Sequence, residues 1–347
     1  MTDYKALIEK TFTEWADLLA ISGGRMQQDA DLFNLVKKYQ HVLDVEGHEI
    51  TNSIYIVLND PATFAWRVET QLNSAVEQVQ VTSDSKRYDT AYVEAFIKAG
   101  YLGGDKLLMT KGQYPLNPFL DQQNFRRGRE AVFFNFHIEK GEVIPVVQPW
   151  DTGYFVCVHD DKGINCTGYK TFRNKDAIQG EHPEMESVNF PDMSSDLEVT
   201  YILSRETSEL WAGGTNIKTG PNKLGYVPVI YRIVPMGSML LDRNSIKYHG
   251  ESGLALIRDL VPELNRLVSI IQSLNMKELD HALQEKKDNL TFGSSIPTAD
   301  ELTRPGTVVE TTGGFSPMPI GEIRNQAELL HKMIQDRIDR AGVNNFQ

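Results

Sequence analysis

A long apolar pattern near the C-terminus constrains the fold of this chain more than any other feature. From Ser252 to Lys286, apolar residues recur at helical spacing over about six turns. The pattern predicts one helix that Ser252 caps and that spans about 50 Å at about 1.5 Å per residue. Pro262 lies inside this helix and is expected to kink it about one turn from its start.

A second, shorter helix is predicted to follow after a change of composition. The segment 287–321 is rich in Gly, Pro, Ser and Thr and holds one β-like run, 306–312. Helical spacing returns over 322–341, and Gly342 is expected to end that helix. The C-terminal third is therefore predicted to be helix, compact module, helix. Because a lone pair of helices cannot bury both of its sides, the broad apolar face favours a symmetric oligomer.

The first part of the chain is predicted to be mainly helical. The run 53–58 is β-branched, so we expect a strand or an extended segment there. Asn59-Asp60-Pro61 is typical of a helix start, with Asp as N-cap and Pro at the first helical position. Gly23 is expected to end the helix 4–19, and Gly100 is expected to end the helix 87–99. The other expected helices cover 4–19, 29–39 and 87–99.

Strand-like runs dominate the middle of the chain. His159–Gly163 is expected to form a hairpin turn. Antiparallel strands placed after helices indicate the α+β class. The expected strands cover 131–137, 142–147, 154–159, 198–203 and 227–234.

The net charge of −12 excludes a protein that holds nucleic acid by neutralising phosphates over its whole surface. It leaves open a conduit for DNA, in which many tight phosphate contacts would resist sliding. The 347 residues are enough for two or more domains. The sequence contains no run of about 18 apolar residues, so no membrane span is expected. Its first residues lack the pattern of a secretory signal.

Candidate chemical motifs are few, and each has a plainer explanation. The segment 213–221 resembles a phosphate loop but lacks the Gly-Lys-Ser/Thr ending, so we expect a β-connection. His159, Asp160 and Asp161 could bind a metal, but a solvated turn explains them better. Glu184 and Glu186 could serve acid–base chemistry, yet such pairs are expected by chance among 47 carboxylates. We therefore expect no catalytic residue, no metal site and no cofactor.

The cysteines and the clustered basic residues are the remaining candidate functional residues. Cys157 and Cys166 flank a turn and could face each other across a hairpin, and we interpret them as reduced, small core or edge residues. The cluster Arg126-Arg127-Gly128-Arg129 is either a phosphate or partner contact or, as we favour, a solvated turn. Lys277-Glu278-Leu279-Asp280-His281 lacks the zinc-protease pattern and is expected to be a polar helix face. Lys277, with Lys286 and Lys287, would repeat around the axis of a ring and centre DNA, or would simply be solvent-exposed.

Several motifs, in this order, resemble the portal proteins of tailed bacteriophages, particularly the long-tailed type. The run 53–64 (SIYIVLNDPATF) is similar to the family's early strand and helix start, and Gln148-Pro149-Trp150-Asp151 to its wing segment. The region 226–267, with Gly250-Glu251-Ser252 and IRDLVPELNRL, is similar to the entry into the first stem helix. The segment 330–342 resembles the returning stem helix.

The resemblance implies a portal-like α+β architecture in five parts. These are a wing (1–247), a first stem helix (248–286), a clip (287–321), a second stem helix (322–341) and the start of a tunnel loop (342–347). Asn344 and Asn345 would then face the DNA. Residues of the clip would bind its partners, and the candidates are Phe292, Arg304, Glu310 and Phe315. Portals normally continue into a wing helix and a crown, whereas this sequence stops at Gln347, so we expect a truncated chain, part of a longer chain or a reduced portal.

The implied function is a non-enzymatic conduit for double-stranded DNA during packaging and ejection. The implied partners are other copies in a ring of about twelve, the large terminase, a head–tail adaptor, and the major capsid and scaffold proteins, with no membrane. The implied location is the portal vertex of the virion, and the host cytoplasm during assembly. Two rivals remain. One is another virion structural or adaptor protein, although adaptors are usually much shorter. The other is a polymer hydrolase, favoured only by the β-rich middle and scattered carboxylates.

Overall fold

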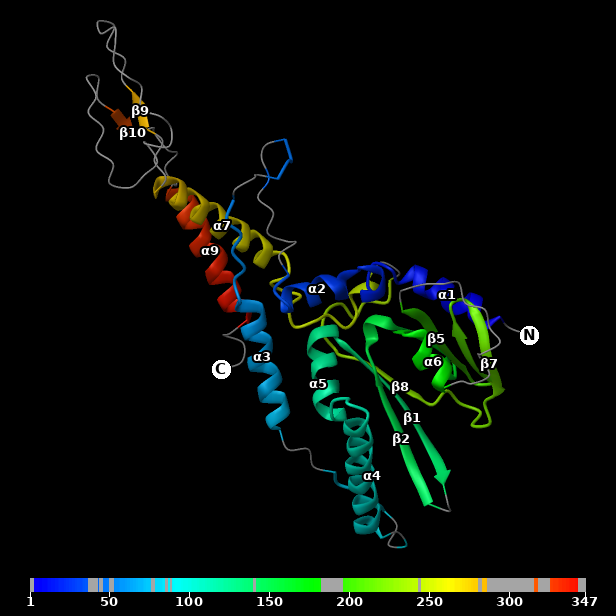
Figure 1. Ribbon diagram of the computed structural model, residues 1–347. Coiled ribbons are helices and arrows are strands. Elements are labelled where there is room, and N and C mark those ends of the chain that lie inside the picture. The colour runs from blue at the N-terminus through cyan, green and yellow to red at the C-terminus, as the bar shows by residue number, and fades with distance from the viewer. Residues whose placement is uncertain are drawn as a thin grey trace, which may run out of the picture. The chain divides into compact units, whose positions relative to one another are not determined.

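The computed structural model forms two compact units, which are described separately (Figure 1). Unit 1 comprises Met1–Asn34 and Pro61–Ala255, and unit 2 comprises Leu35–Asp60 and Leu256–Gln347. The described residues are 3–36, 43, 46–49, 53–75, 79–84, 87, 89–139, 142–181, 196–242, 245–279, 283–285, 315–317 and 325–342.

Unit 1 combines helices with two antiparallel sheets, so the predicted α+β class is confirmed. The sheet orders are β2-β1-β8 and β3-β4-β5-β6-β7. Its helices are α1 (Tyr4–Glu14), α2 (Arg25–Phe33), α3 (Asp60–Ser74, of which Asp60 belongs to unit 2), α4 (Thr90–Thr110), α5 (Leu116–Arg127) and α6 (Lys175–Glu181), with 3-10 turns η1 (Ala20–Ser22), η3 (Thr152–Tyr154) and η5 (Ile246–Tyr248). Its strands are β1 (Arg129–Glu139), β2 (Glu142–Trp150), β3 (Phe155–Asp160), β4 (Gly163–Arg173), β5 (Leu197–Ser204), β6 (Thr207–Ala212), β7 (Thr215–Pro221) and β8 (Val229–Ile233).

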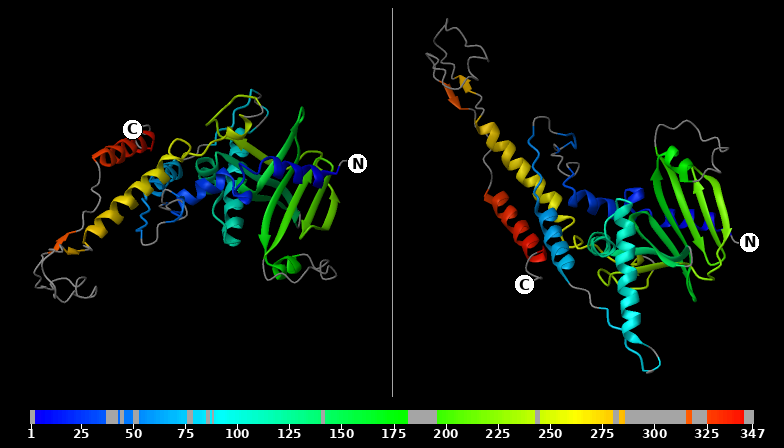
Figure 2. Two further views of the ribbon diagram at one scale, coloured as in Figure 1. Left: turned by 90° about the horizontal axis from the view of Figure 1, so that it is seen from above. Right: turned by 60° about the horizontal axis from the view of Figure 1, so that its bottom comes forward.

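Helix α1 lies across one face of the five-stranded sheet (Figure 2). Its Ile8 packs over Gly168 of β4, where an added Cβ would lie 2.3 Å from Ile8 Cγ2. Strand alternation places Val156 and Ile202 beside Gly168, in register on the same face. All three apolar side chains are buried in one core cluster, so this glycine permits the close approach of helix and sheet.

The opposite face of that sheet packs on the three-stranded sheet. Trp150 at the end of β2 stacks on Tyr169 of β4 with ring centroids 4.7 Å apart and 10° between planes. Phe155 and Val229 belong to the same buried cluster. Alternate residues of β1 point the other way, toward α4 and α5, so that Val132 packs with Leu108 and Leu116. The layers of unit 1 are therefore α1, five-stranded sheet, three-stranded sheet, and α4 with α5.

Both cysteines are free and buried, as expected for small core residues. They do not face each other, because Cys166 belongs to the cluster beneath α1 and Cys157 to the cluster between the sheets. Burial raises the pKa of the Cys157 thiol to about 12 and that of Cys166 to about 11.

Most predicted strands are confirmed, but β4, β6 and β7 were missed. The hairpin at His159–Gly163 is confirmed, with Asp160 opposite Gly163. The segment 213–221 was expected to be a β-connection, but only Gly213-Gly214 form the β6–β7 turn and the rest is strand β7.

Helix boundaries differ more from the predictions. Helix α2 begins at Arg25 after the N-cap Gly24, rather than at Asp29, and ends at Phe33. The prediction that Gly100 ends a helix is wrong, since α4 continues through it to Thr110. The sequence analysis also missed α5.

Unit 2 contains α7 (Leu260–Leu279), β9 (Leu283–Glu285), β10 (Phe315–Pro317) and α9 (Asn325–Gly342). The prediction of one helix from Ser252 is wrong, because residues 253–259 form turns and α7 begins two residues before Pro262. A proline in the first turn costs no helical hydrogen bond, so it marks a start rather than a kink. Ser252 instead donates a hydrogen bond to Asp29 Oδ2 over 2.7 Å within unit 1. The second predicted helix is confirmed as α9.

Within the described ranges, no helix is both long and apolar enough to cross a membrane.

Candidate functional site

The helices α7 and α9 of unit 2 contact each other and form a hairpin (Figures 1 and 2). At the end where α7 finishes, β9 and β10 pair antiparallel, with Phe315 opposite Glu285. The chain thus leaves through one helix, passes a small β pair and returns through the other. The two helices follow the predicted order, whereas the predicted compact module 287–321 and its β-like run 306–312 lie outside the described residues except for 315–317.

An extended segment of the same unit, 53–59, runs antiparallel to α7 and is hydrogen-bonded to its side chains. The backbone N–H of Ile54 donates to Ser273 Oγ over 2.8 Å, and that of Ile56 to Ser269 Oγ over 3.0 Å. The N–H of Leu58 donates to Asn265 Oδ1 over 3.1 Å. We call these three side chains, Asn265, Ser269 and Ser273, the polar row of α7.

The polar row can accept hydrogen bonds from successive N–H groups of the extended segment because the spacing of its side chains nearly matches the spacing of those groups. Every second N–H of an extended chain points the same way, about 6.6 Å apart, while helical positions four apart are separated by about 6 Å. Ser269 and Ser273 also donate their hydroxyl protons to the carbonyls of Asn265 and Ser269, each over 2.7 Å. Their oxygen lone pairs therefore remain to accept from the extended segment.

The outward side of α9 carries an apolar stripe. Leu329, Leu330 and Met333 are 60 %, 49 % and 49 % exposed, and their positions place them on one helix face. Ile338 on another face of the helix is buried. Contiguous exposed apolar side chains of this kind mark interaction surfaces.

The predicted DNA-facing and clip residues fall mostly outside the described residues. Lys277 belongs to the last turn of α7, and Phe315 is the first residue of β10. The others, Lys286, Lys287, Asn344, Asn345, Phe292, Arg304 and Glu310, lie outside the described ranges, as do Glu184 and Glu186.

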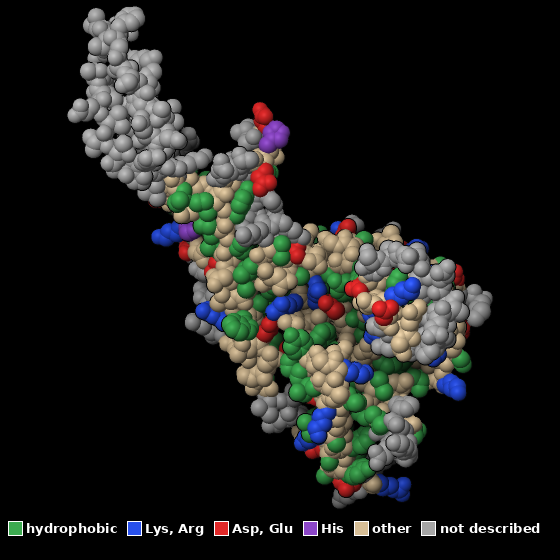
Figure 3. Space-filling view, viewed as in Figure 1, with side chains coloured by type: hydrophobic (Ala, Val, Ile, Leu, Met, Phe, Trp, Pro, Cys, Tyr) green, Lys and Arg blue, Asp and Glu red, His purple; other side chains and the backbone are tan. Residues whose placement is uncertain are grey.

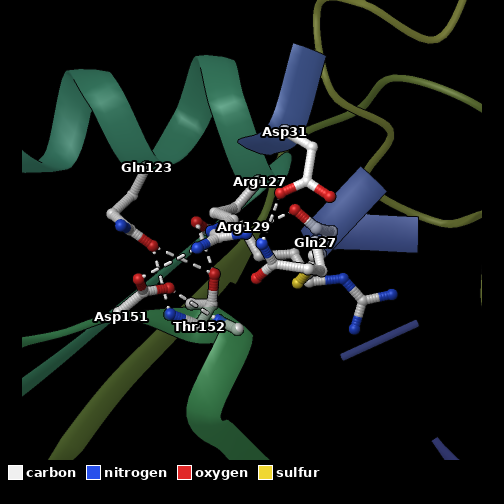
Figure 4. Close-up of polar contacts among 9 residues, drawn as sticks. Gln27, Asp31, Gln123, Arg127, Arg129, Asp151 and Thr152 are labelled. Atoms are coloured by element: carbon white, nitrogen blue, oxygen red, sulfur yellow. Dashed lines mark hydrogen bonds and ion pairs between the residues drawn. The ribbon is translucent and has the colours of Figure 1, made fainter. Parts of the chain in front are cut away.

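The arginine cluster of unit 1 is an internal network, so the favoured solvated turn was wrong (Figure 4). Arg127 donates to the carbonyl of Met26 over 2.6 Å and to Asp151 Oδ2 over 3.1 Å. Arg129 is 2 % exposed and donates to Tyr231 Oη and the carbonyl of His249. Burial, the larger effect, raises the pKa of Tyr231 to about 12 although Arg129 opposes the shift.

The third arginine of the cluster ties two helices of unit 1 together. Arg126 of α5 pairs with Glu69 of α3 through two hydrogen bonds of 2.6 and 3.0 Å. A bidentate pair of this kind fixes orientation as well as charge. These arginines are thus paired with partners within the chain.

The motifs behind the portal resemblance also have structural roles. Gly128 and Gly250 adopt φ values of +68° and +63° and pack backbone to backbone, so an added Cβ at Gly128 would lie 2.0 Å from Gly250 O. Glu251 pairs with Arg25 over 2.8 Å. The segment Gly250-Glu251-Ser252 therefore packs against the α5–β1 junction through Gly250 and binds α2 through Glu251 and Ser252.

The hairpin motif His159-Asp160-Asp161 contacts neighbouring residues of unit 1. Asp160 pairs with Arg205 through two hydrogen bonds of 2.7 Å, which hold the pKa of its carboxyl below the usual value. His159 lies 3.8 Å from Cys157 Sγ. Where the structure describes the chain, no three His, Cys, Asp or Glu side chains gather in a way that could hold a metal ion.

Comparison with known proteins identifies no family. No family model matches this chain, and no curated protein matches its sequence.

Sequence reasoning missed the polar row, although a signal was present. Asn265, Ser269 and Ser273 are polar positions spaced by four within an apolar helical pattern. A polar row inside an apolar stripe indicates that something with backbone donors or acceptors lies along it. The β-branched run 53–58 was the available extended segment.

Proposed function

We propose that this chain is a subunit of a phage portal, a ring that conducts double-stranded DNA. The observation that carries the proposal is the α7–α9 hairpin with an apolar stripe left exposed on α9. A hairpin that exposes such a stripe is incomplete as a monomer, and neighbouring copies would cover it in a ring. The order of the portal-like motifs along the sequence supports the same assignment.

The conduit would act mechanically, without catalysis. The hairpins would surround the DNA, and the segment between α7 and α9 would dock the terminase during packaging and the adaptor afterwards. The negative total charge of −12 suits a channel that lets DNA slide. Lys277, Lys286 and Lys287 would form basic rings that centre the duplex.

Negative-stain imaging of the purified protein tests this function. We expect rings of about twelve copies with a central hole. A stable monomer across the micromolar range would contradict the proposal.

Deletion of 289–319 tests the assignment of the clip. We expect unit 1 to keep its cooperative unfolding transition, because none of the deleted residues belongs to it. Binding of terminase and of adaptor, measured by pull-down, is expected to be lost. Undiminished binding would contradict the assignment of 287–321 as the clip.

A further inference from the structure

Unit 1 has a groove between α4, α5 and the outer face of the three-stranded sheet, with a volume of about 690 Å³. Alternation along the strands places Phe134 and Phe136 of β1 and Ile230 of β8 on this face. Phe96 and Tyr101 of α4 form the opposite wall. Figure 3 shows hydrophobic side chains at the surface in this region. We call this feature the α4 groove.

Helix α4 packs closely on the sheet in its C-terminal half, where Leu108 is buried against Val132 and Val147. Gly104 meets Val147 of β2, where an added Cβ would lie 3.3 Å from Cγ2. Toward its N-terminal half the helix leaves Phe96 52 % exposed, and Ile230 across the groove is 61 % exposed. Large apolar side chains on two facing walls indicate a surface that another chain covers.

Unit 1 also carries a protruding apolar loop, Met236–Asp242. Met239, Leu240 and Leu241 are 67 %, 65 % and 87 % exposed. The loop is nevertheless held in place, since Ser238 N donates to the carbonyl of Tyr248 and His249 Nε2 donates to that of Leu240 over 2.7 Å. A fixed conformation with outward apolar side chains is suited to insertion into a groove, because little ordering is required on binding.

Each of the two surfaces carries one charged side chain that could pair with the other, although the groove lining also includes the carboxylates of Asp121 and Glu130. At one end of the α4 groove, Arg232 has a side chain 70 % exposed and lies 3.7 Å from Glu130. The apolar loop ends on the carboxylate of Asp242, which accepts hydrogen bonds from Ser245. A carboxylate accepts several donors at once, so Asp242 can hold Ser245 and an arginine together.

We infer that the apolar loop of one copy inserts into the α4 groove of the next, with Asp242 meeting Arg232. The loop does not fill the groove of its own copy, as Leu241 remains 87 % exposed. Each copy presents one loop and one groove, and such a head-to-tail contact closes into a ring when the rotation fits. The inference rests on the proposed ring and names the contact that closes it.

Charge reversal followed by mixing tests the inference. Subunits with Arg232→Glu have an altered groove and a native loop, and subunits with Asp242→Arg have the reverse. Each variant alone would place like charges together and is expected to lose at least 90 % of its rings by light scattering and negative stain. An equimolar mixture is expected to restore rings, because alternating copies place opposite charges at every contact. Lys218→Glu on the exposed β7 is the matched control and is expected to assemble normally.

The apolar part is tested by Leu241→Asp, with Leu224→Asp on another exposed turn as its control. Only the first is expected to lose rings, while both keep the circular dichroism spectrum of the native chain. The inference would be overturned if both single charge variants formed rings. It would also be overturned if the mixture assembled no better than either variant alone. Neither outcome would contradict the proposed ring of the native chain. A native chain that never self-associates would overturn both the contact and the proposed function.

Discussion

The two units stabilise their helices in different ways. In unit 1, α1 and the pair α4 and α5 cover the faces of two packed sheets, and Arg127 and Arg129 are hydrogen-bonded to partners inside the unit. In unit 2, α7 is joined to an extended segment by the polar row, and α9 leaves an apolar stripe exposed. Unit 1 thus has packed cores on both faces of its sheets and exposes apolar side chains at the α4 groove and the apolar loop, whereas unit 2 exposes an apolar stripe along a helix of its hairpin. This contrast is what a wing and a stem would show if the ring proposal is right.

The largest expected effect breaks the close packing of unit 1. Gly128→Ala forces a Cβ at φ +68° against the carbonyl oxygen of Gly250. We expect a loss of about 3–5 kcal/mol in the free energy of unfolding, measured by urea denaturation.

A matched control separates backbone conformation from crowding at that glycine. Gly225→Ala changes a glycine at φ +72° that has nothing within 4 Å of an added Cβ. It is expected to cost only about 1 kcal/mol. Equal losses for the two variants would show that the contact between Gly128 and Gly250 does not matter.

A smaller effect is expected in unit 2. Ser269→Ala removes the acceptor of the Ile56 N–H, and the loss of a hydrogen bond at this buried serine is expected to cost about 1–2 kcal/mol. Hydrogen exchange at Ile56 measures it as an about tenfold or greater fall in protection. Ser208→Ala on β6, an exposed serine, is the control. Unchanged protection at Ile56 would contradict the role of the polar row.

The smallest effect concerns the ion pair of Asp160 and Arg205 at the β3–β4 turn. The pKa of Asp160 is lowered in the folded chain, chiefly by the hydrogen bond from Arg205, so the pair contributes stability above the ordinary value of 3.8. That contribution is lost as the pH falls through the lowered value. Asp160→Asn is therefore expected to lower the melting temperature slightly at pH 7 and not at all at the acid end. A difference that persists in acid would contradict this assignment.

The outcomes differ between fold and site for physical reasons. Five of the eight described strands of unit 1, and helix α9, were predictable because each has a clear local pattern, as in 131–137. The start of α7 was not, because Ser252 looks like a cap but bonds to Asp29, a residue distant in sequence. Arg127 and Arg129 were misread for the same reason, since their partners Asp151 and Tyr231 come from other elements. Local patterns cannot reveal which distant group satisfies a charge.

Self-association tests the apolar stripe of unit 2 separately from the folding of unit 1. Met333→Lys places a charge in the exposed stripe of α9 and is expected to leave the unfolding of unit 1 within about 0.5 kcal/mol of the native chain. The same change is expected to disperse the rings, because it buries a charge wherever two copies meet. Native mass spectrometry of the native chain therefore tests the central claim most directly. The account predicts one closed assembly of about twelve copies of the 39.2 kDa chain, and a mass of 39.2 kDa alone at all concentrations would contradict it.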